Sequence, residues 1–357
     1  MLARLLLGLM ILLGVTSVHA DDAPLTRIAF GSCCRQDKPQ PIWNTIADSK
    51  PSLFLFIGDN IYGDSDDIAV LRTKWNLLLA QPGFQRLKQT CPVWATWDDH
   101  DYGRNDGGAE FPIKRESQQL FLDVFEIAKD SPRRQQEGVY DAHIVGPVGK
   151  RTQIILLDTR YNRSPLKLGV KPADVSEGIR GIYAADSSPD KTLLGDTQWK
   201  WLAEQLAKPA EVRIIASSIQ VIPDDHLWEK WGNFPNERER LFRLIASSGA
   251  KGVVLLSGDR HLAEISRLDR ADIGYPLFDI TSSSLNMASG NQTAGIRWVN
   301  EVNRHRVGLT WFETNSGRID IDWQATDPVL TMQVCAETGV PVLTQRIKLS
   351  DLAAKPK

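Results

Sequence analysis

Four short clusters in the sequence combine residue types that bind metal ions, and each follows an apolar run. The clusters are Ser32-Cys33, Asp59 with Tyr62, Asp98-Asp99-His100-Asp101, and Asp259-Arg260-His261. The carboxylate of Asp59 can bridge two cations, and Tyr62 in the same turn can offer a phenolate, which suits ferric iron. A Gly-Asp pair also ends many strands as an ordinary turn. The prediction of a metal centre at Asp59 therefore depends on the partners that the other clusters supply.

Residues 98–106 hold four aspartates around His100. Crowded carboxylates repel one another unless a cation or a strong hydrogen-bond network lies among them. A solvated turn would need only one or two such residues. We therefore expect a metal at Asp99, with Asp98 and Asp101 as turn caps or as supports for the ligands.

The apolar runs before the clusters have the length of strands and alternate with helical patterns. Strands are expected at residues 27–31, 53–57, 93–97, 152–157, 212–217 and 252–257. Between them, residues 41–47 favour a helix, and Ile68, Leu71, Trp75 and Leu78 recur at helical spacing. This order predicts an α/β fold that opens with βαβ units. In such folds ligands bind beyond the carboxyl ends of the strands, where all four clusters would lie.

The C-terminal part of the sequence has a different pattern. Apolar and polar residues alternate at residues 275–281, 307–314, 318–323 and 331–335. We expect these segments to form a second, largely antiparallel sheet. Residues 164–191 and 282–306 are polar and rich in loop-forming residues, and long loops of this kind often carry function. Substrate specificity is expected to lie in these two loops.

The N-terminus predicts export. Arg4 precedes an apolar run at residues 5–15 and the small-residue ending Val18-His19-Ala20, as in a cleaved secretory signal peptide at residues 1–20. The apolar run is short for a membrane span, so a single membrane anchor is the less favoured alternative. Neither a twin arginine nor a cysteine after the cleavage site accompanies it. Export to a bacterial periplasm or the cell exterior, without a stable membrane anchor, is therefore expected.

Residues 21–357 contain no evident linker and are expected to form a single domain. Lys and Arg number 42 against 44 Asp and Glu, without a basic run, so no surface for nonspecific nucleic-acid binding is expected.

Four cysteines are too few for a disulfide framework in a chain of 357 residues. Cys33 is favoured as a metal ligand. The alternatives are a buried apolar role, a disulfide with Cys91 or Cys335, or Cys34 as the ligand instead.

The order and spacing of the clusters resemble the metallophosphoesterases. The departures from that general pattern, such as Ser32-Cys33 at the first strand and Asp259-Arg260-His261 at the last, resemble one branch, the alkaline phosphatase D (PhoD-like) family. Further motifs of the family lie at residues 157–160, 194–202 and 231–238. The likeness runs from Ile28 to Asn286. It implies a metallophosphoesterase-like four-layer α/β/β/α sandwich of two mixed sheets flanked by helices.

The resemblance also implies two metal sites that share one aspartate. The first would hold iron, expected to be ferric, through a set that contains sulfur: Cys33, Asp59, Tyr62 and His261. The second would hold calcium, with magnesium, manganese or zinc as alternatives, through a set of oxygen ligands: Asp59, Asp99, Gln220 and Asp259.

The implied function is an exported, metal-dependent phosphoric ester hydrolase, in which a metal-activated hydroxide attacks the ester. Its substrate would be a small-molecule, lipid or polymer phosphate ester, cleaved by a phosphomonoesterase or phosphodiesterase of the alkaline phosphatase D type. His100 is the candidate general acid or leaving-group stabiliser, and Asn105 would bind metal or phosphate beside it. Arg160 would bind phosphate oxygens or, alternatively, form a structural ion pair. A non-catalytic secreted binding protein on the same fold is the alternative function.

Overall fold

The computed structural model describes residues 23–169, 181–291 and 301–354. The predicted signal peptide, residues 1–20, lies outside the described residues, as do parts of the two loops expected to carry specificity. No helix among the described residues is long and apolar enough to cross a membrane.

One sheet combines strands from both ends of the chain, in the order β14-β13-β12-β1-β2-β3. Its strands are β1 (Arg27–Gly31), β2 (Leu53–Ile57), β3 (Val93–Thr96), β12 (Asn315–Asp322), β13 (Val329–Ala336) and β14 (Pro341–Lys348). The first three are parallel to one another, whereas β12, β13 and β14 continue the sheet as antiparallel neighbours from β1. The carboxyl ends of β1, β2 and β3 therefore lie along one edge.

The other sheet has the strand order β10-β11-β9-β8-β5-β4. Its strands are β4 (Asp141–Val145), β5 (Thr152–Leu156), β8 (Val212–Ala216), β9 (Val253–Ser257), β10 (Ala263–Asp269) and β11 (Pro276–Ser282). The four inner strands are parallel, and antiparallel strands β4 and β10 close the two edges. Both sheets are thus mixed.

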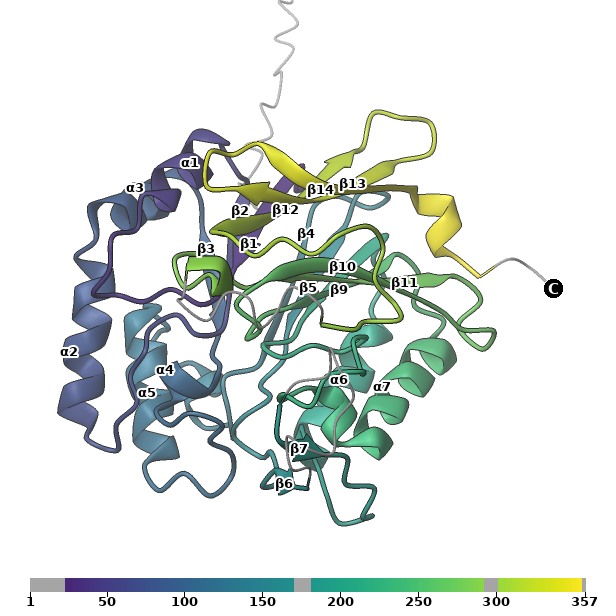
Figure 1. Cartoon of the computed structure of the whole chain (residues 1–357). Coiled ribbons are helices and arrows are strands. Elements are labelled where there is room, and N and C mark those ends of the chain that lie inside the picture. Colours follow the sequence, from purple (N-terminus) through teal and green to yellow (C-terminus); the bar gives the residue numbers. More distant parts are fainter. Residues whose placement is uncertain (1–22, 170–180, 292–300, 355–357) are drawn as a thin grey trace, which may run out of the picture.

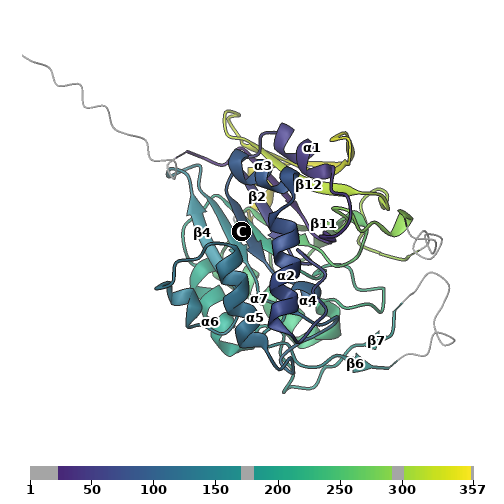
Figure 2. The same cartoon turned by 90° about the vertical axis from the view of Figure 1, so that its left-hand side faces the viewer.

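Helices cover the outer face of each sheet, as Figures 1 and 2 show. The first sheet is covered by α1 (Ile42–Asp48), α2 (Ile68–Leu79), α3 (Pro82–Thr90) and α5 (Lys114–Val124), and the second by α6 (Gly195–Leu206) and α7 (Pro235–Ser248). A short helix, α4 (Asp99–Tyr102), follows β3, and a two-stranded ribbon joins β6 (Lys167–Leu168) to β7 (Tyr183–Ala184).

The sequence of β2 explains why the layers stack in this order. Successive side chains of a strand point to opposite faces, and every residue of β2 is buried. Phe54 and Phe56 contact Trp43 of α1 with ring centroids 5.5 and 5.6 Å apart, whereas Leu55 belongs to the apolar core between the two sheets. The strand is therefore apolar on both faces, and the predicted four-layer α/β/β/α sandwich is confirmed.

The predicted grouping of the C-terminal segments is wrong. Residues 275–281 fall mostly in β11, which lies parallel to β9 in the second sheet, while β12 and β13 extend the first sheet beside β1. Residues 307–314 form no strand and make an isolated bridge between Trp311 and Ala263. Alternation in a sequence reports that one face of a strand is exposed, but it does not identify the neighbouring strand.

Candidate metal centre

The candidate ligands lie just after four strands, three of which are neighbours in the first sheet. Cys33 follows β1, Asp59 follows β2 and Asp99 opens α4 after β3, while Asp259 and His261 follow β9 of the second sheet. Backbone hydrogen bonds join the strand ends, including one of 2.9 Å from the N–H of residue 34 to the carbonyl of Asp59. The two sheets therefore present their ligands to one shared region.

The backbone is unusual at these positions. Positive φ angles occur at Cys33 (58°), Asp59 (48°), Asp259 (68°) and His261 (53°), and they make up four of the eight non-glycine cases among the described residues. Left-handed backbone costs roughly 1–3 kcal/mol at such residues and persists where the surrounding structure enforces it. Its concentration at the strand ends fits a functional site, because each turn redirects a side chain into the shared region.

The first group of ligand atoms contains the thiol. One sulfur, one carboxylate oxygen and one imidazole nitrogen, from Cys33, Asp59 and His261, lie within 4.8 Å of one another. The Sγ of Cys33 lies 3.3 Å from Oδ2 of Asp59, and the Tyr62 hydroxyl lies 2.8 Å from Nε2 of His261.

Cys34, unlike Cys33, packs in the apolar cluster beneath α1 and α2. All four cysteines are free, so the alternative of a disulfide is wrong.

The second group consists of oxygen atoms alone. Carboxylate oxygens of Asp59, Asp98, Asp99 and Asp259 lie within 4.8 Å of one another. Oδ1 of Asp59 and Oδ2 of Asp98 are buried and have no hydrogen-bond partner in the described structure. Buried polar atoms are normally paired, so these orphaned oxygens and the composition of both groups fit bound cations. Asp59 belongs to both groups, as a bridging ligand would.

Burial and mutual repulsion perturb these carboxyl groups. Burial, together with the nearby Asp99, raises the pKa of Asp59 against the opposing charge of His100. Burial, followed by Asp98 and Asp99, raises the pKa of Asp259, and burial raises that of Asp98 to about 7 although Arg160 opposes it. So many carboxylates in one buried region are unfavourable unless cations compensate them.

His100 stands at the exposed side of the centre with a carboxylate partner. Its Nδ1 lies 2.6 Å from Oδ1 of Asp64. Burial disfavours the charged imidazolium, but the nearby carboxylates of Asp99 and Asp59 outweigh that effect and raise the pKa of His100 to about 11. Asn105 and His100 both line an open hollow of about 440 Å³.

His261 differs from His100 in its protonation. Burial, followed by the charge of His100, lowers the pKa of His261 to about 4, which keeps that imidazole neutral and able to bind a metal.

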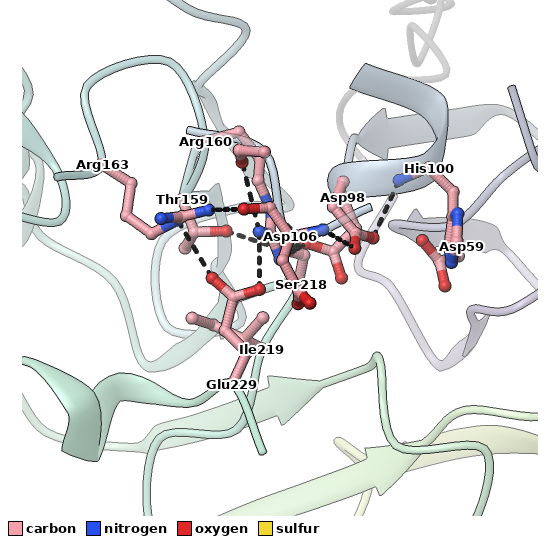
Figure 3. A network of polar contacts seen from close by, with 12 residues as sticks. Asp59, Asp98, His100, Asp106, Thr159, Arg160, Arg163, Ser218, Ile219 and Glu229 are labelled. Atoms are coloured by element: carbon pink, nitrogen blue, oxygen red, sulfur yellow. Dashed lines mark hydrogen bonds and ion pairs between the residues drawn. The ribbon is translucent and has the colours of Figure 1, made fainter. Parts of the chain in front are cut away.

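Arg160 forms buried ion pairs, which is the second of the two roles predicted for it. Its side chain is 0% exposed and forms ion pairs with Asp98 and Glu229, as Figure 3 shows. Nε donates to Oδ1 of Asp98 at 2.6 Å and Nη1 donates to Oε2 of Glu229 at 2.7 Å. Arg163 pairs with the second oxygen of Glu229 at 3.0 Å. The donors of Arg160 thus already face buried carboxylates, which fits the alternative of a structural ion pair, and its role in binding substrate stays a prediction.

The side-chain amide of Gln220 is engaged in hydrogen bonds with three buried neighbours. Its amide nitrogen donates to Glu264 at 2.9 Å and to Thr281 at 2.8 Å, and its carbonyl oxygen lies 2.9 Å from Nε2 of His226. The role of Gln220 as a metal ligand stays a prediction.

Asp101 caps α4 by accepting the backbone N–H of Asp98 at 2.6 Å, as expected.

Sequence reasoning assigned no role to several residues that the structure brings to the centre. Asp64 contacts His100, Ser283 lies 3.1 Å from Sγ of Cys33, and Glu229 and Asp106 form a further acidic group with Asp99. Asp64 and Asp106 stand within the acid-rich runs, which was a usable signal. Glu229 carries no local signal, because only the fold brings its loop to Arg160.

The sequence matches one family over most of its length. The family model of PhoD-like phosphatases matches residues 28–327. Alkaline phosphatase D of Bacillus subtilis (strain 168) is 23% identical over 285 residues, which cover 69% of this chain and 48% of that protein. The chain thus spans about half the length of this curated relative.

Two solved structures share the fold. That of PhoD has a TM-score of 0.66 at 17% identity and covers 94% of this chain and 73% of its own. A dimetal phosphatase from Danio rerio has a TM-score of 0.55 at 12% identity and covers 91% of this chain and 99% of its own. These likenesses bear on the fold alone, whereas the family match rests on the sequence. The predicted family is confirmed, and this chain belongs to the PhoD-like phosphatases.

Proposed function

We propose that this protein is a metal-dependent phosphoric ester hydrolase. The observation that carries the proposal is the position of Asp59, which belongs to both groups of ligand atoms and keeps one buried oxygen without a partner. Membership of the PhoD-like phosphatases supports the same reaction class. Two cations held close together can hydrolyse phosphate esters, and a carboxylate common to both groups would help to hold them so.

The donor types of the two groups favour different ions. Cys33, Tyr62 and His261 with Asp59 would hold iron, in the ferric state, because thiolate and imidazole suit transition metals and phenolate suits the ferric ion. Asp59, Asp99 and Asp259 would hold calcium, with magnesium, manganese or zinc as alternatives, because hard oxygen ligands suit such ions. Bound together, such ions supply Lewis acidity toward a phosphoryl group and activate water as the nucleophile.

The chain's own residues supply the proton for the leaving group. Asp64 engages Nδ1 of His100, which fixes the imidazole ring and leaves Nε2 as the nitrogen that can give a proton to a departing alkoxide. Asn105 stands in the same hollow, where its amide could contact the phosphoryl oxygens. The ester would enter from this exposed side, because the opposite side of the centre is filled by the network around Arg160.

We also infer that the protein is exported. The supporting observation is the sequence of residues 1–20, with one early arginine, an apolar run and a small-residue ending. Determination of the N-terminal residue of the protein recovered from the periplasm or the medium tests this inference. A mature chain that begins after Ala20 is expected, and an intact N-terminus on a cytoplasmic protein would contradict export.

The decisive experiment compares a nitrophenyl phosphate monoester with the matching diester, using residues 21–357 supplied with iron and calcium. The Asp59→Asn protein is the blank, because it should lose bound metal and nearly all turnover. Strong preference for one ester would define the enzyme as a phosphomonoesterase or a phosphodiesterase. Wild-type turnover no higher than the blank on either ester would contradict the proposal and favour a binding protein on this fold.

A further inference from the structure

One contact joins the ribbon outside the metal centre to the loop that carries its ligands. The hydroxyl of Tyr183, in β7, donates to Oδ2 of Asp106 at 2.6 Å across 77 positions of sequence. Tyr183 is 8% exposed, so water competes little for this hydrogen bond. Asp106 lies on the loop that follows α4, the helix that Asp99 opens.

Asp106 is a junction between two residues expected to act at the centre. Its backbone N–H donates to Oδ2 of Asp99 at 2.6 Å, and its Oδ2 also accepts from Nδ2 of Asn105 at 2.7 Å. Asp106 therefore holds the carboxylate of one residue and the amide of the other. Its φ angle of 52° lies in the left-handed region, which a non-glycine residue keeps only when its surroundings enforce it.

Tyr183 is itself held by the second sheet's side of the molecule. The backbone N–H groups of residues 182 and 183 both donate to the carbonyl of Leu227, at 2.9 and 2.8 Å. The same loop continues to Glu229, which pairs with Arg160 and Arg163. Tyr183 thus reaches Asp106 from an anchored backbone rather than from a free surface chain.

We propose that Tyr183 is a positioning residue of the metal centre: its hydrogen bond fixes Asp106, and Asp106 in turn fixes the Asp99 carboxylate and the Asn105 amide. This inference rests on the proposed function for its effect on turnover, but its effect on metal retention stands independently. Partners that orient metal ligands typically contribute 10- to 100-fold to metal affinity or activity. The ribbon would then contribute to the centre through geometry, without touching the reacting atoms.

The test is Tyr183→Phe, which removes one hydroxyl and keeps the ring. The matched control is Tyr275→Phe. Tyr275 is 6% exposed, and its hydroxyl donates to the carbonyl of Ala250 at 2.6 Å. It precedes β11, at the end of the second sheet opposite the candidate ligands that follow β9. For each protein, the metal retained against increasing EDTA, kcat and KM on the nitrophenyl esters, and urea unfolding are measured. We expect Tyr183→Phe to lose metal at roughly tenfold lower EDTA and to lower kcat about tenfold, with the control near wild type.

A second variant separates positioning from general destabilisation. Asp106→Gly keeps the backbone N–H and accepts a positive φ, but it removes the carboxylate that Tyr183 contacts. In this background Tyr183→Phe should change metal retention less than twofold, because the contact is already absent. Equal metal loss by Tyr183→Phe and Tyr275→Phe, or an unchanged EDTA profile, would overturn the inference. Absence of wild-type turnover would overturn the proposed function alone, since the EDTA comparison needs no substrate.

Discussion

Cys33 and Cys34 are neighbours in sequence, but their side chains meet different chemistry. Cys33 faces Asp59 and Ser283, whereas Cys34 packs among apolar side chains. We expect Cys33→Ser to weaken metal binding at least roughly 100-fold, because a serine hydroxyl does not replace a thiolate toward a transition metal. Cys34→Ser should keep its metal and lower the free energy of unfolding by about 1–3 kcal/mol, because it buries a hydroxyl.

Metal content after gel filtration, with urea unfolding of the same samples, checks both cysteine variants. A metal-loaded Cys33→Ser protein alongside a metal-free Cys34→Ser protein would reverse the assignment.

Asp64 gives a second prediction at the level of single residues. Asp64→Asn removes the anionic partner of Nδ1 in His100, so the imidazole should lose orientation and proton affinity. We expect kcat to fall roughly 10- to 100-fold for an alkyl phosphate and much less for a nitrophenyl phosphate, whose leaving group needs no proton. The control is Asp269→Asn, because Asp269 is exposed at the end of β10 and pairs with Arg267 at 2.9 Å, outside the hollow that His100 lines.

Rates measured over a series of leaving groups decide this prediction. Equal losses for good and poor leaving groups would argue against a proton donated by His100.

At the scale of the elements, the end of β2 is a tightly constrained turn of the centre. Gly58 has a φ of 106°, and a Cβ there would lie 2.6 Å from Cβ of Asp98 and 2.9 Å from Cβ of Ser218. Gly149 also has a positive φ, 89°, but a Cβ there would meet nothing within 4 Å. Both alanine variants carry the backbone cost, and Gly58→Ala should lower the free energy of unfolding by about 1–3 kcal/mol more, because it crowds packed atoms.

Urea unfolding of Gly58→Ala and Gly149→Ala measures this difference. Similar unfolding free energies for the two would show that the strand end relaxes without strain.

The sequence predicted the parallel strands of both sheets better than the partners of the C-terminal strands. The ends of β2 and β9 were found because an apolar run stops at Gly-Asp, which is a local signal. The placement of β12 and β13 beside β1 was missed, since pairing across almost 300 positions leaves no mark in either segment. Arg160 stayed open between two roles for the same reason: its partner Glu229 is brought to it by the fold.

For the whole molecule, His226 links stability to pH. This residue is 2% exposed, and burial, followed by the charges of Arg260 and Lys230, lowers its pKa well below the ordinary range. The unfolded chain, in which the histidine pKa is about 6.5, therefore binds a proton below that pH, whereas the folded chain keeps His226 neutral. Stability from this group is fully present above about pH 6.5 and falls as the pH decreases, by up to about 1.4 kcal/mol per pH unit.

The difference between wild type and His226→Gln isolates this effect, because the other titrating groups are common to both proteins. Measured by urea unfolding, the wild-type free energy should fall relative to the variant between pH 7.5 and pH 5.5. Parallel pH profiles would show that His226 takes up its proton in the folded state.

The ligand groups draw on both sheets: Cys33, Asp59 and Asp99 follow strands of the first, and Asp259 and His261 follow β9 of the second. An ion held by both would cross-link the two layers, and only the folded chain offers it that set of donors. Folding and metal supply then become linked by mass action, with about 2.7 kcal/mol gained when free metal exceeds its Kd 100-fold. EDTA should lower the urea midpoint of the wild type and leave that of Asp59→Asn almost unchanged. Scarcity of metal would thus shorten the life of the folded protein as well as slow its chemistry.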